Sequence, residues 1–188
     1  MVNGIILVII PLLALTNADQ MANIMNALQI DGLIEAHNLD GTSRSALRDI
    51  IIPRMDEIQY DTSSTMFLLS SPQYFVDNPL FLQAVLRCYR QRTLRLVSVD
   101  EAHLYAMHGR SFRVAMRILQ RLLFNVIFAI GVWHPLLLAM TATMTDSLVA
   151  SFSTLTSVQR DASCGDNPWD SKRCLILSDT TAFHQRYI

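Results

Sequence analysis

Short apolar runs alternate with segments of helical periodicity along the whole chain. Apolar runs of four to six residues are typical of buried strands, and they lie at 5–10, 33–37, 65–69, 94–99, 136–140 and 174–177. Apolar residues that recur every three or four positions predict helices at 19–28, 44–58, 79–90, 111–128 and 146–157. This alternation is typical of β-α-β units. It predicts an α/β fold with a parallel β-sheet and helices on both faces.

Composition narrows the classes of protein that the pattern allows. A length of 188 residues suits one domain of ordinary size, and 51% hydrophobic with 16% charged residues excludes intrinsic disorder. Fourteen of the fifteen cationic residues are arginines, and Lys172 is the only lysine. The net charge of -1 gives no general basic surface of the kind that nucleic-acid-binding domains often carry. The three cysteines are an odd number without close pairing, which favours a reducing nuclear or cytoplasmic location over secretion.

Two uncharged stretches leave a membrane protein open as an alternative. Met1 to Ala18 resembles the apolar core of a signal peptide, although no positively charged segment precedes it. Leu122 to Thr145 is long enough to cross a bilayer, but His134 and Pro135 interrupt it. Buried parallel strands also read as continuous apolar runs, so hydropathy alone does not decide between sheet and membrane.

Polar residues directly follow four of the predicted strands. Ligands bind beyond the carboxyl ends of strands in open parallel sheets, so these residues are the candidates for chemistry. They are Pro11 and Thr16, then Ser70, Ser71 and Gln73, then Asp100, Glu101 and His103, and finally Thr141 and Thr143.

Asp100 and Glu101 form a pair of adjacent carboxylates with no basic neighbour. A structural cap would need only one carboxylate, whereas nucleotide hydrolysis uses two. In that reaction Asp100 would hold Mg²⁺ through water, and Glu101 would orient and deprotonate the attacking water. Both interpretations remain open on these residues alone.

The sequence around this pair resembles superfamily 2 helicases, and more narrowly the RecQ family. An apolar strand followed by Asp-Glu-Ala-His at 100–103 is similar to motif II, and Thr-Ala-Thr at 141–143 is similar to motif III. The loop after motif II reads roughly C-I-S-Q-W-G-H-D-F-R in the family. Gly109, Phe112 and Arg113 match it, whereas Met107 and His108 replace its glutamine and tryptophan.

Two further segments resemble RecQ motifs in the family's order. Residues 11–20, PLLALTNADQ, are similar to motif Ia, and residues 70–73, SSPQ, are similar to motif Ib with Gln73 in place of an acid. The resemblance implies a RecA-like domain of the P-loop NTPase type, ATP and Mg²⁺ as cofactors, and DNA as partner. It implies catalysis by Asp100, Glu101 and His103, coupling through Thr141 and Thr143, and nucleic-acid contacts from Pro11, Thr16, Ser71, Gln73, His108, Phe112 and Arg113.

The sequence contains no phosphate-binding loop of the form G-x-x-x-x-G-K-[ST], and Lys172 does not follow a glycine. The resemblance therefore predicts that residues 1–188 are a partial first motor domain, incomplete at the N-terminus and without the second RecA-like domain. We expect negligible ATPase activity from the isolated chain, and an unpaired sheet edge through which it could self-associate. The alternatives are a noncatalytic nucleic-acid-binding module derived from a helicase and a small membrane protein.

Overall fold

The computed structural model describes residues 3–10, 25–27, 33–61, 63–107, 110–130, 133–141, 150, 154, 174–178 and 186–187. Only the backbone is described for residues 105–107, 110–113, 129–130, 174–178 and 186–187. The chain divides into two compact units, Met1–Ser98 and Val99–Ile188. Each unit is described by itself below.

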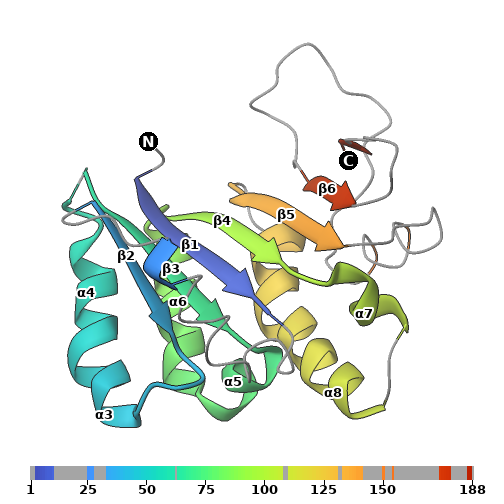
Figure 1. Ribbon diagram of the computed structural model, residues 1–188, viewed down its shortest axis with the longest axis horizontal. Helices are drawn as coiled ribbons and strands as arrows, with labels where there is room; N and C mark the ends of the chain where they lie inside the picture. The colour runs from blue at the N-terminus through green and yellow to red at the C-terminus, as the bar shows by residue number, and fades with distance from the viewer. Residues whose placement is uncertain are drawn as a thin grey trace. The chain divides into compact units, whose positions relative to one another are not determined.

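The first unit is built on parallel strands (Figure 1). They are β1 (Gly4–Ile9), β2 (Ile34–Asn38), β3 (Thr65–Ser70) and β4 (Leu94–Val99), in the spatial order β2-β3-β1-β4. β3 lies between β1 and β2, because Thr65 lies opposite both Gly4 and Ile34. All four strands were predicted within one residue of each end, since each is a short apolar run that the sheet buries.

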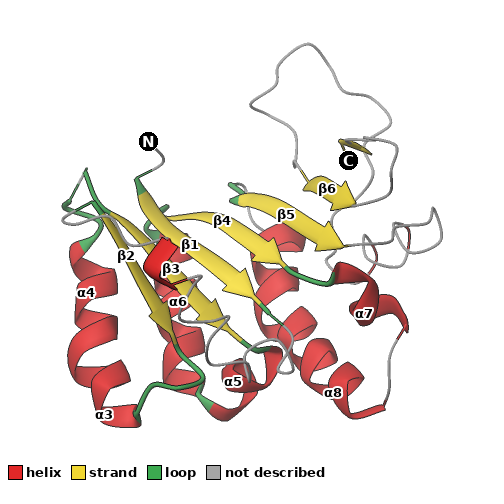
Figure 2. Ribbon diagram, in the orientation of Figure 1, coloured by secondary structure: helices red, strands yellow, loops and turns green. Residues whose placement is uncertain are grey.

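Helices pack on one face of this sheet, and a short helical stretch lies on the other. One face carries α3 (Arg44–Ala46), η1 (Leu47–Ile51), α4 (Ile52–Glu57) and α6 (Pro79–Arg90), which together form the layer seen behind the strands in Figure 2. On the other face Met25, in the short helical stretch 25–27, packs with Val8, Ile10, Phe67 and Leu69. The expected α/β class with a helix-covered parallel sheet is confirmed and is consistent with a RecA-like type of fold. The remainder of the predicted helix 19–28 lies outside the described residues.

A short helix that periodicity did not predict, α5 (Pro72–Asp77), follows β3 directly. Ser71 caps it, with its hydroxyl accepting a hydrogen bond from the Tyr74 amide at 3.2 Å. Asn78 then precedes the proline that begins α6, and its side-chain amide donates to the Tyr74 carbonyl at 3.0 Å. Tyr74 and Phe75 both pack against Phe81, so α5 is held by aromatic contacts with α6.

The second unit contains helices followed by strands. They are α7 (Ala102–Met107), α8 (Arg110–Leu119), η2 (Gln120–Ile130), β5 (Leu136–Thr141), β6 (Cys174–Ser178) and β7 (Arg186–Tyr187). β5 pairs in parallel with β6 from Leu137 to Thr141, so the side of β5 that faces β6 is hydrogen-bonded to another strand. β7 pairs antiparallel with β6, a departure from the parallel arrangement that the apolar runs predicted.

The apolar stretch Leu122–Thr145 is divided between a helix and a strand. Its first part continues η2 to Ile130, and β5 begins at Leu136. Phe124, Phe128 and His134 form a ladder of stacked rings, and His134 Nδ1 lies 2.7 Å from the Ile127 carbonyl oxygen. Within the described ranges, no helix has both the length and the apolar character needed to cross a bilayer.

Candidate active site

Asp100 and Glu101 occupy a tight turn between the end of β4 and the start of α7. Glu101 has a φ of 48°, a left-handed conformation that side chains other than glycine, asparagine and aspartate adopt at a cost. Its amide donates to Asp100 Oδ1 at 2.8 Å, and its carbonyl accepts from the Leu104 amide at 2.8 Å. Positive φ in a non-glycine residue is often found where function imposes it, so the turn marks a candidate site.

His103 of α7 is held against Thr141, the last residue of β5, within the second unit. His103 Nδ1 lies 2.7 Å from Thr141 Oγ1, a hydrogen bond between residues 38 positions apart. Thr141 is 7% exposed, and the His103 side chain is 20% exposed. A short bond between two such shielded groups fixes the imidazole relative to the carboxyl end of β5.

Glu101 Oε2 is a buried oxygen that could still accept a hydrogen bond. It lies 3.2 Å from His103 Nδ1, but that nitrogen makes its closer contact with Thr141. Among the described residues Oε2 has no hydrogen-bond partner, although the Glu101 side chain as a whole is 41% exposed. A buried carboxylate oxygen without a donor is costly, and such atoms occur at sites that bind or deprotonate something.

Asp100 suits a divalent cation only together with a ligand that brings further oxygens. Within the described part of the chain, no cluster of three His, Cys, Asp or Glu side chains could hold a metal ion alone. Mg²⁺ keeps several waters and takes one or two carboxylates plus substrate phosphates, so a lone aspartate fits that mode of binding. Asp100 could supply one of the carboxylate ligands of such an ion.

The predicted nucleic-acid-contact residue Ser71 is fully buried and has internal partners. Its amide donates to Asp40 Oδ2 at 2.6 Å, and its hydroxyl donates to Asp40 Oδ1. This hydroxyl also caps α5, which gives Ser71 a structural role at the carboxyl end of β3. Gln73 is exposed two residues later, and its side-chain amide donates to Asp77 Oδ1 at 3.0 Å.

Asp40 is a residue that the sequence reasoning missed. Asp40 lies just beyond the carboxyl end of β2, as Ser71 lies just beyond that of β3. A search for polar residues after every predicted strand, including 33–37, would have found it. The paired acceptor atoms of its carboxylate hold the ends of β2 and β3 together.

The remaining predicted contacts fall where the structure says less. Phe112 and Arg113 lie in α8, where only their backbone is described. The predicted residues Pro11, Thr16, His108 and Thr143 lie outside the described residues.

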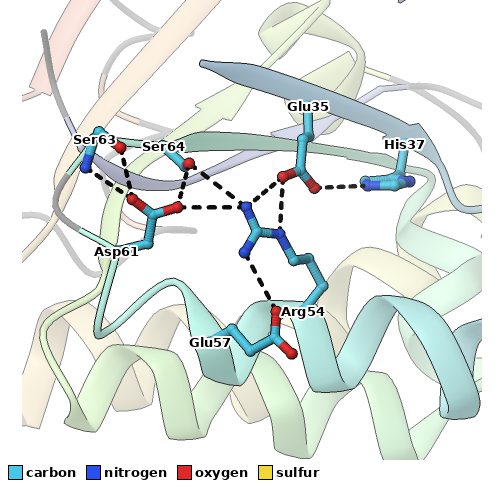
Figure 3. Close-up of polar contacts among 7 residues, drawn as sticks. All are labelled: Glu35, His37, Arg54, Glu57, Asp61, Ser63 and Ser64. Carbon is cyan, nitrogen blue, oxygen red and sulfur yellow. Dashed lines mark hydrogen bonds and ion pairs between the residues drawn. The ribbon is translucent and has the colours of Figure 1, made fainter. Parts of the chain in front are cut away.

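A second polar cluster lies in the first unit, centred on Arg54 of α4 (Figure 3). Its guanidinium contacts Glu35 Oε1 of β2 at 2.5 Å, Glu57 Oε2 at 3.3 Å and Asp61 Oδ2 at 3.5 Å. Hydrogen bonding to Glu35 is the main reason that the pKa of Arg54 is raised further above its usual value. Hydrogen bonds from Ser64 and then Ser63 hold the pKa of Asp61 well below its usual range. Every charge at its centre has an opposite charge beside it, so the cluster locks α4 to the sheet.

His37 lies at the edge of the Arg54 cluster without a hydrogen-bond partner of its own. Its Nε2 is 3.9 Å from Glu35 Oε2, too far for a hydrogen bond, and is buried and unpartnered among the described residues. Burial lowers the pKa of His37, and this outweighs the opposing effect of Glu35.

The chain was compared with models of known protein families and with curated proteins. No model of a known protein family matches the chain, and no curated protein matches it with significance.

Proposed function

We propose that the chain is part of an ATP-dependent DNA helicase motor of RecQ-like type, in which the turn after β4 performs ATP hydrolysis and β5 links it to strand separation. The observation that carries the proposal is the hydrogen bond of 2.7 Å between His103 and Thr141. It joins the two segments that resemble motifs II and III, which lie far apart in sequence.

The described residues suggest a division of roles within this site. Asp100 would hold the magnesium ion of a bound nucleotide through water, and the nucleotide would supply the phosphoryl group to be transferred. Glu101 Oε2, a buried acceptor without a donor, suits the orientation and deprotonation of a water molecule. His103 contacts both Glu101 and Thr141. A change in charge near Glu101 would therefore alter the hydrogen bond between His103 and the end of β5.

Two finer features belong to the same proposal. Nucleic-acid contact at Gln73 is compatible with its exposure, whereas the buried Ser71 would act by fixing the start of α5. A nuclear or cytoplasmic location accords with Cys88, a buried free thiol whose pKa burial raises to about 11.

A chimera tests the proposal at the level of turnover. The chain is placed after the phosphate-loop segment of an established RecQ-like helicase and before that helicase's second motor domain, and phosphate release is measured with and without single-stranded DNA. We expect DNA-stimulated hydrolysis that Glu101→Gln lowers by about 10²-fold or more, within the range that general-base catalysis contributes. Thr141→Val should retain hydrolysis but lose unwinding, because it removes the hydroxyl that contacts His103.

Glu57→Gln is the matched control, since it also neutralises one glutamate but lies in the Arg54 cluster. It should leave turnover unchanged. The 188-residue chain alone should release no more phosphate than its Glu101→Gln variant. Equal hydrolysis by the unaltered chimera and its Glu101→Gln variant would refute the proposal.

A further inference from the structure

Four arginines recur along one helical segment of the second unit. Arg110, Arg113 and Arg117 belong to α8, and Arg121 is the second residue of η2. Spacings of three and four residues place their backbone positions on one side of the helix, about 6 Å apart along its axis for a spacing of four. We call these four residues the arginine row.

The described side chains of the arginine row are exposed and are not paired with carboxylates. Arg117 and Arg121 are both exposed, and no ion pair joins either to another described residue. In the first unit, by contrast, Arg54 and Arg87 each contact a carboxylate, with two hydrogen bonds from Arg87 to Asp56 at 2.8 and 3.0 Å. Arg117 and Arg121 therefore keep their guanidinium donors available to a ligand.

The sequence around the row excludes a local acidic partner. No aspartate or glutamate occurs between Glu101 and Asp146, whereas all four arginines of the row fall in that interval. The chain as a whole has a net charge of -1, so this positive segment is a local feature. The buried Ala115, Met116 and Leu119 lie on another side of the same helical segment from the exposed Arg117 and Arg121.

We propose that the arginine row binds the phosphate backbone of a single-stranded nucleic acid. Arginine donates two parallel hydrogen bonds to a phosphate, and a row along a helix can address successive phosphates of one strand. Val114 and Leu122 each follow an arginine of the row in sequence, are exposed at 55% and 45%, and offer apolar contact to sugars and bases. The choice of a nucleic-acid strand as the polyanion rests on the proposed function, but binding by the row requires no hydrolysis.

The test measures binding of the 188-residue chain to fluorescein-labelled oligothymidylate by fluorescence anisotropy, without nucleotide, over a range of salt concentrations. Each single-strand phosphate contact contributes about 0.7 to the slope of log affinity against log salt. The double variant Arg117→Gln/Arg121→Gln should therefore lower the slope by about 1.4 and weaken binding roughly 20-fold at 0.1 M salt. Thermal melting followed by circular dichroism confirms that each variant is folded.

Two further double variants separate the row from general charge. Arg44→Gln/Arg90→Gln also removes two exposed arginines, but from the first unit, and should bind as the unaltered chain does. Arg117→Lys/Arg121→Lys keeps both charges and should retain the salt slope while losing part of the affinity.

Three results would overturn the proposal. They are no binding of oligothymidylate by the unaltered chain, equal losses in the two Gln double variants, and capture of polyglutamate in preference to the oligonucleotide, which would indicate an acidic protein partner. Binding by the row requires no hydrolysis. A failure of hydrolysis in the chimera with binding still dependent on the row would therefore refute the proposed function alone.

Discussion

The two polar clusters of this protein differ in whether their carboxylates have hydrogen-bonding partners among the described residues. Around Arg54 in the first unit, one guanidinium meets three carboxylates, and serine hydroxyls complete the hydrogen bonds of Asp61. Around His103 in the second unit, Glu101 Oε2 lies 3.2 Å from Nδ1 of the imidazole and has no hydrogen-bond partner among the described residues. The first arrangement stabilises a fold. The second costs stability and leaves an acceptor for a ligand, which is expected of a site that does chemistry.

The largest expected effect comes from removing the guanidinium at the centre of the Arg54 cluster. Arg54→Met should lower the free energy of unfolding by about 2 kcal/mol, because it leaves the partly buried Glu35 and Asp61 without their cation. Urea unfolding measures the change. Arg48→Met is the matched control, since Arg48 pairs with its exposed neighbour Asp49 and its loss should change the free energy of unfolding far less. Equal losses in the two variants would show that the cluster contributes nothing particular.

The second effect concerns the turn that holds Glu101. Its φ of 48° penalises any side chain with a Cβ, so Glu101→Gly should be more stable than Glu101→Ala by about 1 kcal/mol. Arg92, with a φ of 61°, should show the same order. At Arg90, which is helical, the alanine variant should instead be more stable than the glycine variant by about 0.5–1 kcal/mol. A lower stability of Glu101→Gly than of Glu101→Ala in thermal melting would argue against strain at the site.

The smallest effect is the pH dependence that His37 contributes at the edge of the Arg54 cluster. Its pKa is lowered in the folded chain, so the unfolded chain binds its proton more readily. The resulting stability is complete above the ordinary pKa of about 6.5 and is lost as the pH falls through the lowered value. His37→Gln should flatten this part of the curve of unfolding free energy against pH. An unchanged curve in that variant would show that His37 does not respond to pH in this way.

The order of strands and long helices could be predicted from the sequence because burial on both sheet faces leaves continuous apolar runs. The end of β3 was predicted within a residue for this reason, and the start of α6 was predicted from apolar positions that recur every three or four residues. The six-residue helices α5 and α7 could not be, since two turns are too short for a periodicity to show. The antiparallel β7 has only two residues, which leave no pattern.

The candidate site was predictable in its residue types but not in its geometry. Strand-end position identified Asp100, Glu101, His103 and Thr141. Their contacts depend on the pairing of distant segments and on the positive φ at Glu101, neither of which leaves a local signal. The Arg54 cluster was missed for the same physical reason, since Glu35 and Arg54 are 19 positions apart and meet only when α4 packs on β2.

The most direct test of a nucleotide site after β4 is to locate Mn²⁺-ATP on the chimera, which supplies the phosphate loop that the sequence lacks, by paramagnetic broadening of the amide NMR signals of residues 1–188. Binding at Asp100 predicts selective broadening around Ala102, His103 and Thr141, absent in Asp100→Asn and retained in Asp77→Asn, which alters an aspartate of the first unit. Broadening that is the same in Asp100→Asn as in the unaltered chimera, or that is centred away from these residues, would contradict the account.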